Sequence, residues 1–114
     1  VIRCPKAIIH QIVIILIHIL SGVSYVLVKS GSTCTRITSL YECSTAARAL
    51  RLSDTTASDD GQSGVSYDPP YCYFESGTLK YNSNGRNTGQ CTTTDSCVCR
   101  INNVFYTGVY NSYY

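Results

Sequence analysis

Apolar side chains are unevenly distributed along the chain. The stretch KAIIHQIVIILIHIL, residues 6–20, holds ten Ile, Leu or Val side chains among fifteen positions, whereas later segments alternate apolar and polar residues at short spacings. At 100° per residue, His10, Gln11 and His18 share one sector of a helix and the rest of the circumference is apolar. In a strand the same polar residues fall on both faces. The pattern favours a helix and leaves a strand open, because the isoleucines also suit a sheet.

Four roles are consistent with this segment. A cleaved signal peptide fits, because basic residues precede the apolar stretch and small residues follow it. A membrane span is the second role, although His10, Gln11 and His18 interrupt the run of about 20 apolar residues that a bilayer requires. The other two roles are a donor strand that completes another subunit's sheet and a helix packed among copies of itself.

If membrane insertion and cleavage are set aside, hydrophobic burial requires a partner for this segment. Ten buried Ile, Leu and Val side chains contribute about 15 to 30 kcal/mol as an upper estimate, and a small domain has no spare core to receive them. We therefore expect other copies of the chain to bury this segment. The expected assembly interface comprises Ile8, Ile9, Ile12, Val13, Ile14, Ile15, Leu16, Ile17, Ile19 and Leu20.

Residues 25–101 contain short periodic segments separated by turns. The stretch YVLVK, which begins at Tyr25, is rich in β-branched residues and predicts a strand. The stretch SLYE supplies a capping box, with Ser39 at the N-cap and Glu42 three residues later, and predicts a helix that ends near Ser53. The expected buried face of this helix comprises Leu40, Cys43, Ala47 and Leu50.

Further along the chain, YCYFESGTLKYN predicts a hairpin that turns at Ser76–Gly77. The expected buried face of the hairpin comprises Cys72, Phe74, Leu79 and Tyr81. Residues 53–64, before it, have no periodicity and predict an exposed loop, whose aspartates lack the spacing of a calcium-binding loop. After the hairpin, CVCRI predicts a strand, and residues 102–114 form an aromatic, β-prone tail.

Seven cysteines add a covalent framework to these elements. Cys4 stands alone, and the other six are Cys34, Cys43, Cys72, Cys91, Cys97 and Cys99. Their even number and density are typical of a disulfide-stapled domain from an oxidising compartment. Residues 97 and 99 lie on the same face of a strand, so we expect these two cysteines to bond to different partners.

Six cysteines allow fifteen connectivities, and the sequence does not choose among them. The expected bonds join Cys72 to Cys91 and leave Cys34 and Cys43 for Cys97 and Cys99. Cys4 is expected to be free or bonded between subunits. Zinc is the competing interpretation, but no CxxC pair or downstream histidine completes a ligand set. We therefore expect no metal site.

The pattern C...EC...AA...L, followed by PPYCYFESGTLKYNSN and then CVCR, resembles a cysteine-rich extracellular module that recurs in secreted and surface proteins of algae and other protists. The resemblance covers about residues 25–101 and is most specific between Cys72 and Asn82. It implies a small secreted α+β fold and brings no catalytic residues with it.

These patterns predict three parts. Residues 1–24 form an apolar assembly segment, and residues 25–101 form a disulfide-stapled α+β domain with one helix on a short antiparallel sheet. Residues 102–114 form a Tyr-rich tail. The predicted location is secreted, extracellular or at the cell surface, because disulfides persist in oxidising compartments.

Composition and charge exclude several functions. A net charge of +2 with both signs scattered does not form the dense basic patch of a nucleic-acid-binding protein. The two histidines, His10 and His18, lie in the apolar segment, so no Ser-His-Asp or Cys-His arrangement is expected in the domain. A helix cap and a hairpin tip explain Glu42 and Glu75 better than glycoside chemistry does. We expect neither enzymatic activity nor a cofactor.

The tyrosines leave a binding function open. Tyr71, Tyr73 and Tyr81 either offer a platform for sugar rings or pack the sheet, and packing is the ordinary role of tyrosines in strands. The predicted function is a structural subunit of an extracellular, self-assembling filament, whose partners are other copies of the same chain. The alternative is a membrane-anchored or secreted carbohydrate-binding module. Ser and Thr residues are candidates for O-linked glycans, whereas no Asn-X-Ser/Thr sequon occurs.

Overall fold

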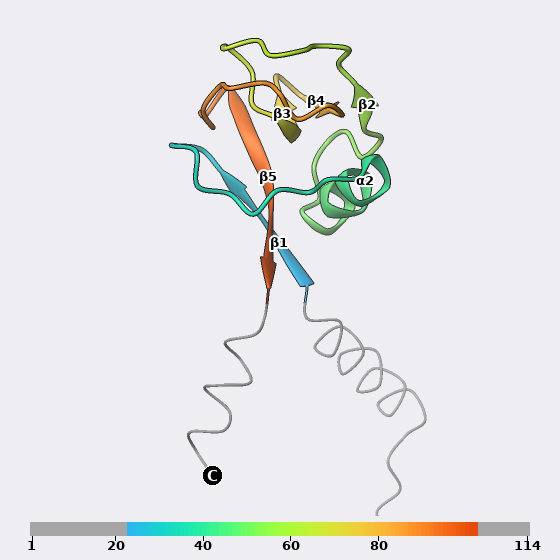
Figure 1. Ribbon diagram of the computed structural model, residues 1–114. Helices are drawn as coiled ribbons and strands as arrows, with labels where there is room; N and C mark the ends of the chain where they lie inside the picture. The colour runs from blue at the N-terminus through green and yellow to red at the C-terminus, as the bar shows by residue number, and fades with distance from the viewer. Residues whose placement is uncertain (1–22, 103–114) are drawn as a thin grey trace, which may run out of the picture. The chain divides into compact units, whose positions relative to one another are not determined.

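The computed structural model describes residues 23–102, and Tyr25–Ile101 form one compact unit within it. The apolar segment 6–20 with its ten expected interface residues, Cys4 and the tail 103–114 lie outside the described residues. The elements along the described chain are β1 (Val23–Val28), α2 (Leu40–Ala49), β2 (Ser58–Asp59), β3 (Tyr71–Glu75), β4 (Thr78–Asn82) and β5 (Asp95–Asn102) (Figure 1). This α+β architecture agrees with the prediction.

The five strands form one mixed sheet in the order β1-β5-β3-β4-β2. Strand β3 pairs antiparallel with both β4 and β5, whereas β2 pairs parallel with β4. The prediction of a short antiparallel sheet is therefore wrong. The extra strand comes from residues 53–64, where Ser58 and Asp59 lie opposite Lys80 and Tyr81. Strand β2 is only two residues long, which is too short for an alternating pattern, so the sequence does not predict it.

Helix α2 begins at the predicted capping box. The Glu42 main-chain N–H donates to Ser39 Oγ at 3.0 Å, which satisfies one of the free N–H groups of the first turn. The helix ends at Ala49, before the predicted end near Ser53, because Arg51 takes the left-handed conformation that terminates a helix, with φ of 56°.

One residue of the predicted helix face is misplaced. The buried helix residues are Cys43, Ala46 and Ala47, whereas Leu40 is 45% exposed. Leu40 is the first residue of the helix, so no preceding helical turn lies beside its side chain. The buried stripe is consequently shorter than the periodicity indicates.

The hairpin forms as predicted. Ser76 and Gly77 both have positive φ, 49° and 84°, as a two-residue type I′ turn requires. Cys72 lies opposite Tyr81, and Phe74 lies opposite Leu79. Phe74 is half-buried, and the other three expected core residues of the hairpin are buried.

Two clusters make up the core on opposite sides of the sheet. The larger one packs α2 against the sheet and contains Ile37, Cys43, Ala46, Ala47, Ala57, Cys72, Leu79, Tyr81 and Val98. The smaller one contains Cys91, Cys97 and Cys99, with Val26, Val28 and Cys34 against them. Each cluster is small for a domain of this size, which is the circumstance in which covalent bonds add most to stability.

Three disulfides join the six cysteines of the domain. The bonds are Cys34–Cys99, Cys43–Cys72 and Cys91–Cys97. As expected, residues 97 and 99 bond to different partners, but the expected bond between Cys72 and Cys91 is wrong. Cys72 belongs to the cluster that faces α2, and Cys91 belongs to the cluster on the other side. Cys72 therefore bonds to Cys43 of the helix, and Cys91 bonds to its near neighbour on β5.

Candidate functional site

The most distinctive chemistry of the described domain is a buried polar network beside β3. Side chains alternate along a strand, so Tyr73 points away from the face that carries Cys72 and Phe74. Tyr73 is fully buried, and its hydroxyl donates to Asp60 Oδ2 at 2.7 Å. Burial and the nearby Asp60 carboxylate raise the pKa of this tyrosine, so the hydroxyl remains a donor at all physiological pH values.

Gln62 connects this tyrosine to the rest of the network. Its Nε2 donates to Asp68 Oδ2 at 2.7 Å, and its Oε1 accepts from Asn87 Nδ2 at 2.8 Å. Its main-chain carbonyl accepts from Asn82 Nδ2 at 2.9 Å. These bonds tie the loop that follows β2 to Asn82 at the end of β4 and to Asn87 beyond it. Because each of these side chains has a hydrogen-bond partner, the network holds this loop in one conformation.

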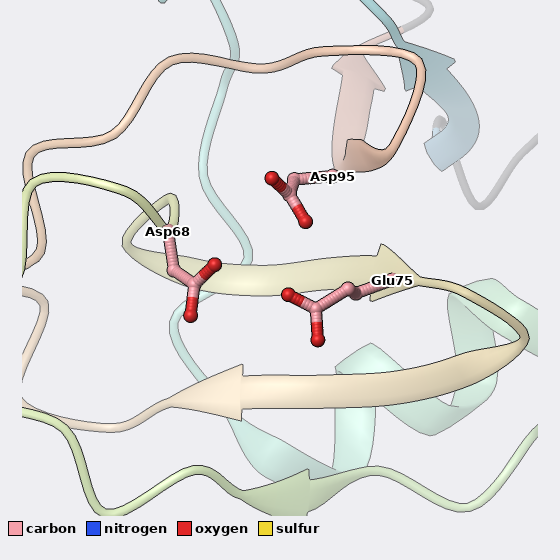
Figure 2. A group of neighbouring side chains, drawn as sticks. All are labelled: Asp68, Glu75 and Asp95. Carbon is pink, nitrogen blue, oxygen red and sulfur yellow. The ribbon is translucent and has the colours of Figure 1, made fainter.

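Three carboxylates meet at one edge of the network. Figure 2 shows Asp68, Glu75 and Asp95 directed toward one another, and an oxygen of each lies within 4.8 Å of the others. Asp68 belongs to the loop before β3, Glu75 ends β3, and Asp95 begins β5. The pairing of β3 with β5 places Glu75 opposite Asp95. Asp68 is only 4% exposed, and the other two are half-buried.

Lys80 supplies the positive charge of this cluster. Its ammonium group forms an ion pair with Glu75 Oε2 across the hairpin. The ion pair lowers the pKa of Glu75 and raises the pKa of Lys80. In contrast, burial and then the neighbouring Glu75 raise the pKa of Asp95. Three adjacent carboxylates with one cation repel one another, and of the three Asp95 is the one whose neutral form its surroundings favour.

The cluster has two chemical uses. Carboxylate oxygens are the ligands that Ca²⁺ and Mg²⁺ prefer, and among residues 23–102 these three acids are the group whose spacing suits a metal ion. However, the Lys80 ammonium group already forms an ion pair with Glu75, and its positive charge lies where a metal ion would bind. A structural role, in which the cluster holds the loop before β3 to the ends of β3 and β5, accounts for these residues without an ion. The expectation of no metal site stays a prediction.

The two glutamates examined for glycoside chemistry lie in separate ion pairs. Glu75 pairs with Lys80, and Glu42 Oε1 lies 2.9 Å from Arg100 Nε. The second pair joins the first turn of α2 to β5. Each carboxylate thus has a cation as its neighbour.

The sheet tyrosines pack the domain, as the simpler interpretation predicts. Tyr73 is fully buried, Tyr81 is 5% exposed, and Tyr71 is half-buried with its ring 6.4 Å from that of Tyr81. Among residues 23–102, the tyrosines with large exposed fractions are Tyr41 at 79%, in α2, and Tyr67 at 69%, in the loop before β3. Tyr73 and Tyr81 are too buried to offer their ring faces to a sugar, which is what the alternative interpretation of the sheet tyrosines requires.

The chain matches no protein-family model, no curated protein and no solved structure. The resemblance to the extracellular cysteine-rich module stays a prediction. No helix among residues 23–102 is long and apolar enough to cross a membrane. The functional conclusion accordingly rests on the residues and their contacts.

The prediction that residues 53–64 form a solvated loop is wrong in part, because their aspartates bind the domain's own groups. Asp54 Oδ2 accepts from the Leu79 main-chain N–H at 3.0 Å, and Asp60 accepts from Tyr73. Ala57 is buried in the larger core cluster. The one sequence signal for these contacts is the excess of Asp and Asn, which bond readily to nearby N–H groups. Composition of this kind does not reveal the distant partners.

Proposed function

We propose that the protein is a structural subunit of an extracellular, self-assembling filament. The apolar segment, residues 7–20, is buried between subunits, and the disulfide-stapled domain covers the outside. The observation that supports this proposal most strongly is that Tyr25–Ile101 complete a compact unit with its own core clusters. The segment before this domain holds ten Ile, Leu and Val side chains. We expect them to be buried against something other than the domain core, because a large exposed apolar surface is unfavourable in water.

The chemistry of the domain supports an extracellular location. Three disulfides join all six cysteines between positions 34 and 99, and such bonds persist in oxidising compartments. The acids and amides of the polar network bond to one another within the domain, so they hold its shape. A subunit that repeats along a filament gains from this rigidity, since every copy must present the same surface.

The geometry of assembly follows from the segment's position before the domain. A projecting element that enters a neighbouring subunit produces a head-to-tail contact, and such contacts extend into open filaments unless rotation closes a ring. The partners are therefore other copies of the same chain. In the alternative, the segment anchors the protein in a membrane or is removed, and the domain binds carbohydrate.

Electron microscopy of protein isolated without detergent tests the proposal. We expect filaments of uniform width, with the domain as the outer layer. A dispersed monomer in the absence of detergent would contradict the proposal and favour a soluble binding module. Particles that require detergent micelles would contradict it in favour of the membrane anchor.

A further inference from the structure

Two loops at one end of the sheet expose hydroxyl groups. The first loop, residues 30–33, follows β1, and the second, residues 92–94, precedes β5. The Cys91 main-chain N–H donates to the Gly31 carbonyl at 2.8 Å, so the two loops are in contact. Figure 1 shows the end of β1 and the start of β5 at the same end of the sheet. The exposed side chains of these loops are Ser30, Ser32, Thr33, Thr92, Thr93 and Thr94.

The second loop holds its tip in a fixed position. The Thr92 main-chain N–H donates to the Asp95 carbonyl, and the Asp95 N–H donates to Thr92 Oγ1, both at 2.9 Å. The Cys91–Cys97 disulfide closes the same loop covalently. Thr93 and Thr94 form the tip, and within the described domain their hydroxyls have no hydrogen-bond partner. The loop thus presents two free hydroxyls from a rigid base.

This tip is also uncharged. Its nearest acid in sequence, Asp95, is directed toward Glu75 in the carboxylate cluster (Figure 2). A transferase that modifies a hydroxyl needs an accessible, unbonded oxygen, and a sugar attached there would displace no contact of the domain. Buried hydroxyls such as Ser96, which is 5% exposed and donates to the Thr92 carbonyl, do not meet this condition.

We propose that Thr93 and Thr94 carry O-linked sugars and that this end of the domain is the glycan-bearing exterior of the filament. The inference rests on the proposed function for its extracellular setting. In the modification, the threonine Oγ attacks the anomeric carbon of a nucleotide-activated sugar. The nucleotide phosphate leaves with the bonding electron pair, and the hydroxyl proton passes to a base of the glycosyltransferase.

The tip lies directly before the start of β5. Strand β5 runs from Asp95 to Asn102, which is about 23 Å at the usual rise per residue. Figure 1 shows β1 beginning at the end of the sheet where β5 finishes. The start of β1 and the tip formed by Thr93 and Thr94 therefore lie at opposite ends of the sheet.

Peptide mass spectrometry of the natively isolated protein tests this inference. We expect sugar masses on the peptide that spans residues 87–100, with fragmentation that retains the sugar assigning them to Thr93 or Thr94. An unmodified peptide, a phosphate in place of a sugar, or sugars confined to other regions would each overturn the inference.

Substitutions distinguish glycosylation at Thr93 and Thr94 from glycosylation of exposed threonines in general. Thr93→Val with Thr94→Val preserves shape and removes both hydroxyls, so the sugar mass on this peptide should be lost completely when the chain is secreted from its native host. Thr56→Val, an exposed threonine in the loop that contains β2, is the matched control and should leave that mass unchanged. Persistence of the sugar in the double variant would contradict the assignment.

The two proposals can fail separately. Filaments whose residues 87–100 lack sugar would overturn the glycan site and leave the filament standing. Glycosylated protein that does not assemble would overturn the filament and leave Thr93 and Thr94 as modified residues.

Discussion

Cys43 of α2 is bonded to Cys72 of β3, with their Cα atoms 5.5 Å apart and both side chains buried in the larger core cluster. The bond joins the helix to the middle of the sheet, where Leu79 and Tyr81 pack on the same face. The covalent bond and the apolar core therefore hold the same interface together.

The three disulfides should differ in their contribution to stability. Their cysteines are separated by 65, 29 and 6 residues for Cys34–Cys99, Cys43–Cys72 and Cys91–Cys97. Loop-closure entropy then gives about 4, 3.5 and 2 kcal/mol in that order. Urea unfolding of the three double-alanine variants measures this ranking. An equal or larger loss on removing Cys91 and Cys97 would contradict it.

The Tyr73 hydroxyl should be essential to the polar network. Tyr73→Phe removes the donor to the half-buried Asp60 carboxylate, which should lower the free energy of unfolding by about 1 to 3 kcal/mol. Tyr67→Phe is the matched control, because Tyr67 is 69% exposed, and should change stability little. Equal effects of the two changes in chemical denaturation would refute the role of this hydrogen bond.

Asp95 should make the domain less stable as the pH rises. Its pKa in the folded domain lies above the ordinary value of 3.8, mainly because of burial and then because of Glu75. The folded state thus holds this proton more tightly than the unfolded chain, and the stabilisation, complete below pH 3.8, is lost as the pH rises through the folded pKa. Asp95→Asn cannot ionise, so its advantage in Tm over the native protein should increase from acid to neutral pH.

Glu75 provides the contrast for that titration. Lys80 lowers the pKa of Glu75 below its ordinary value of 4.5, so its stabilisation is present above pH 4.5 and is lost as the pH falls through the folded pKa. Glu75→Gln should therefore cost most at neutral pH. A Tm difference for Asp95→Asn that does not vary with pH would contradict the raised pKa of Asp95.

The protein should have no hydrolytic or transfer activity of its own. The domain contains no histidine, and Glu42 and Glu75 each have a cationic partner. A screen with glycoside and ester substrates should show no turnover above background. Turnover that disappears with Glu42→Gln or Glu75→Gln would reverse this expectation.

Local signals in the sequence predicted local structure. Ser39 and Glu42 lie three residues apart, and their hydrogen bond is formed within one helical turn. The turn at Ser76–Gly77 needs two residues with positive φ, and it determines the pairing of β3 with β4. Both features depend on interactions between neighbours in the chain.

The candidate site depends on distant pairings that the sequence does not encode locally. Asp68, Glu75 and Asp95 come together because β5 pairs with β3, and no periodicity specifies which strands are neighbours. The same cause explains the disulfide error, since Cys72 and Cys91 differ in the face of the sheet on which they lie. The partners of Asp60 were missed because its loop has no regular pattern.

The central claim is that the apolar segment, residues 7–20, is buried between subunits. A double substitution in this segment tests it most directly. Ile14→Asp with Ile15→Asp should abolish filaments in electron micrographs and leave a dispersed protein with three intact disulfides, because two buried charges without partners cost several kcal/mol. Tyr41→Asp, at an exposed position of α2, is the matched control and should leave the filaments unchanged. Filaments of normal width formed by the double variant would contradict the claim that residues 7–20 are buried between subunits.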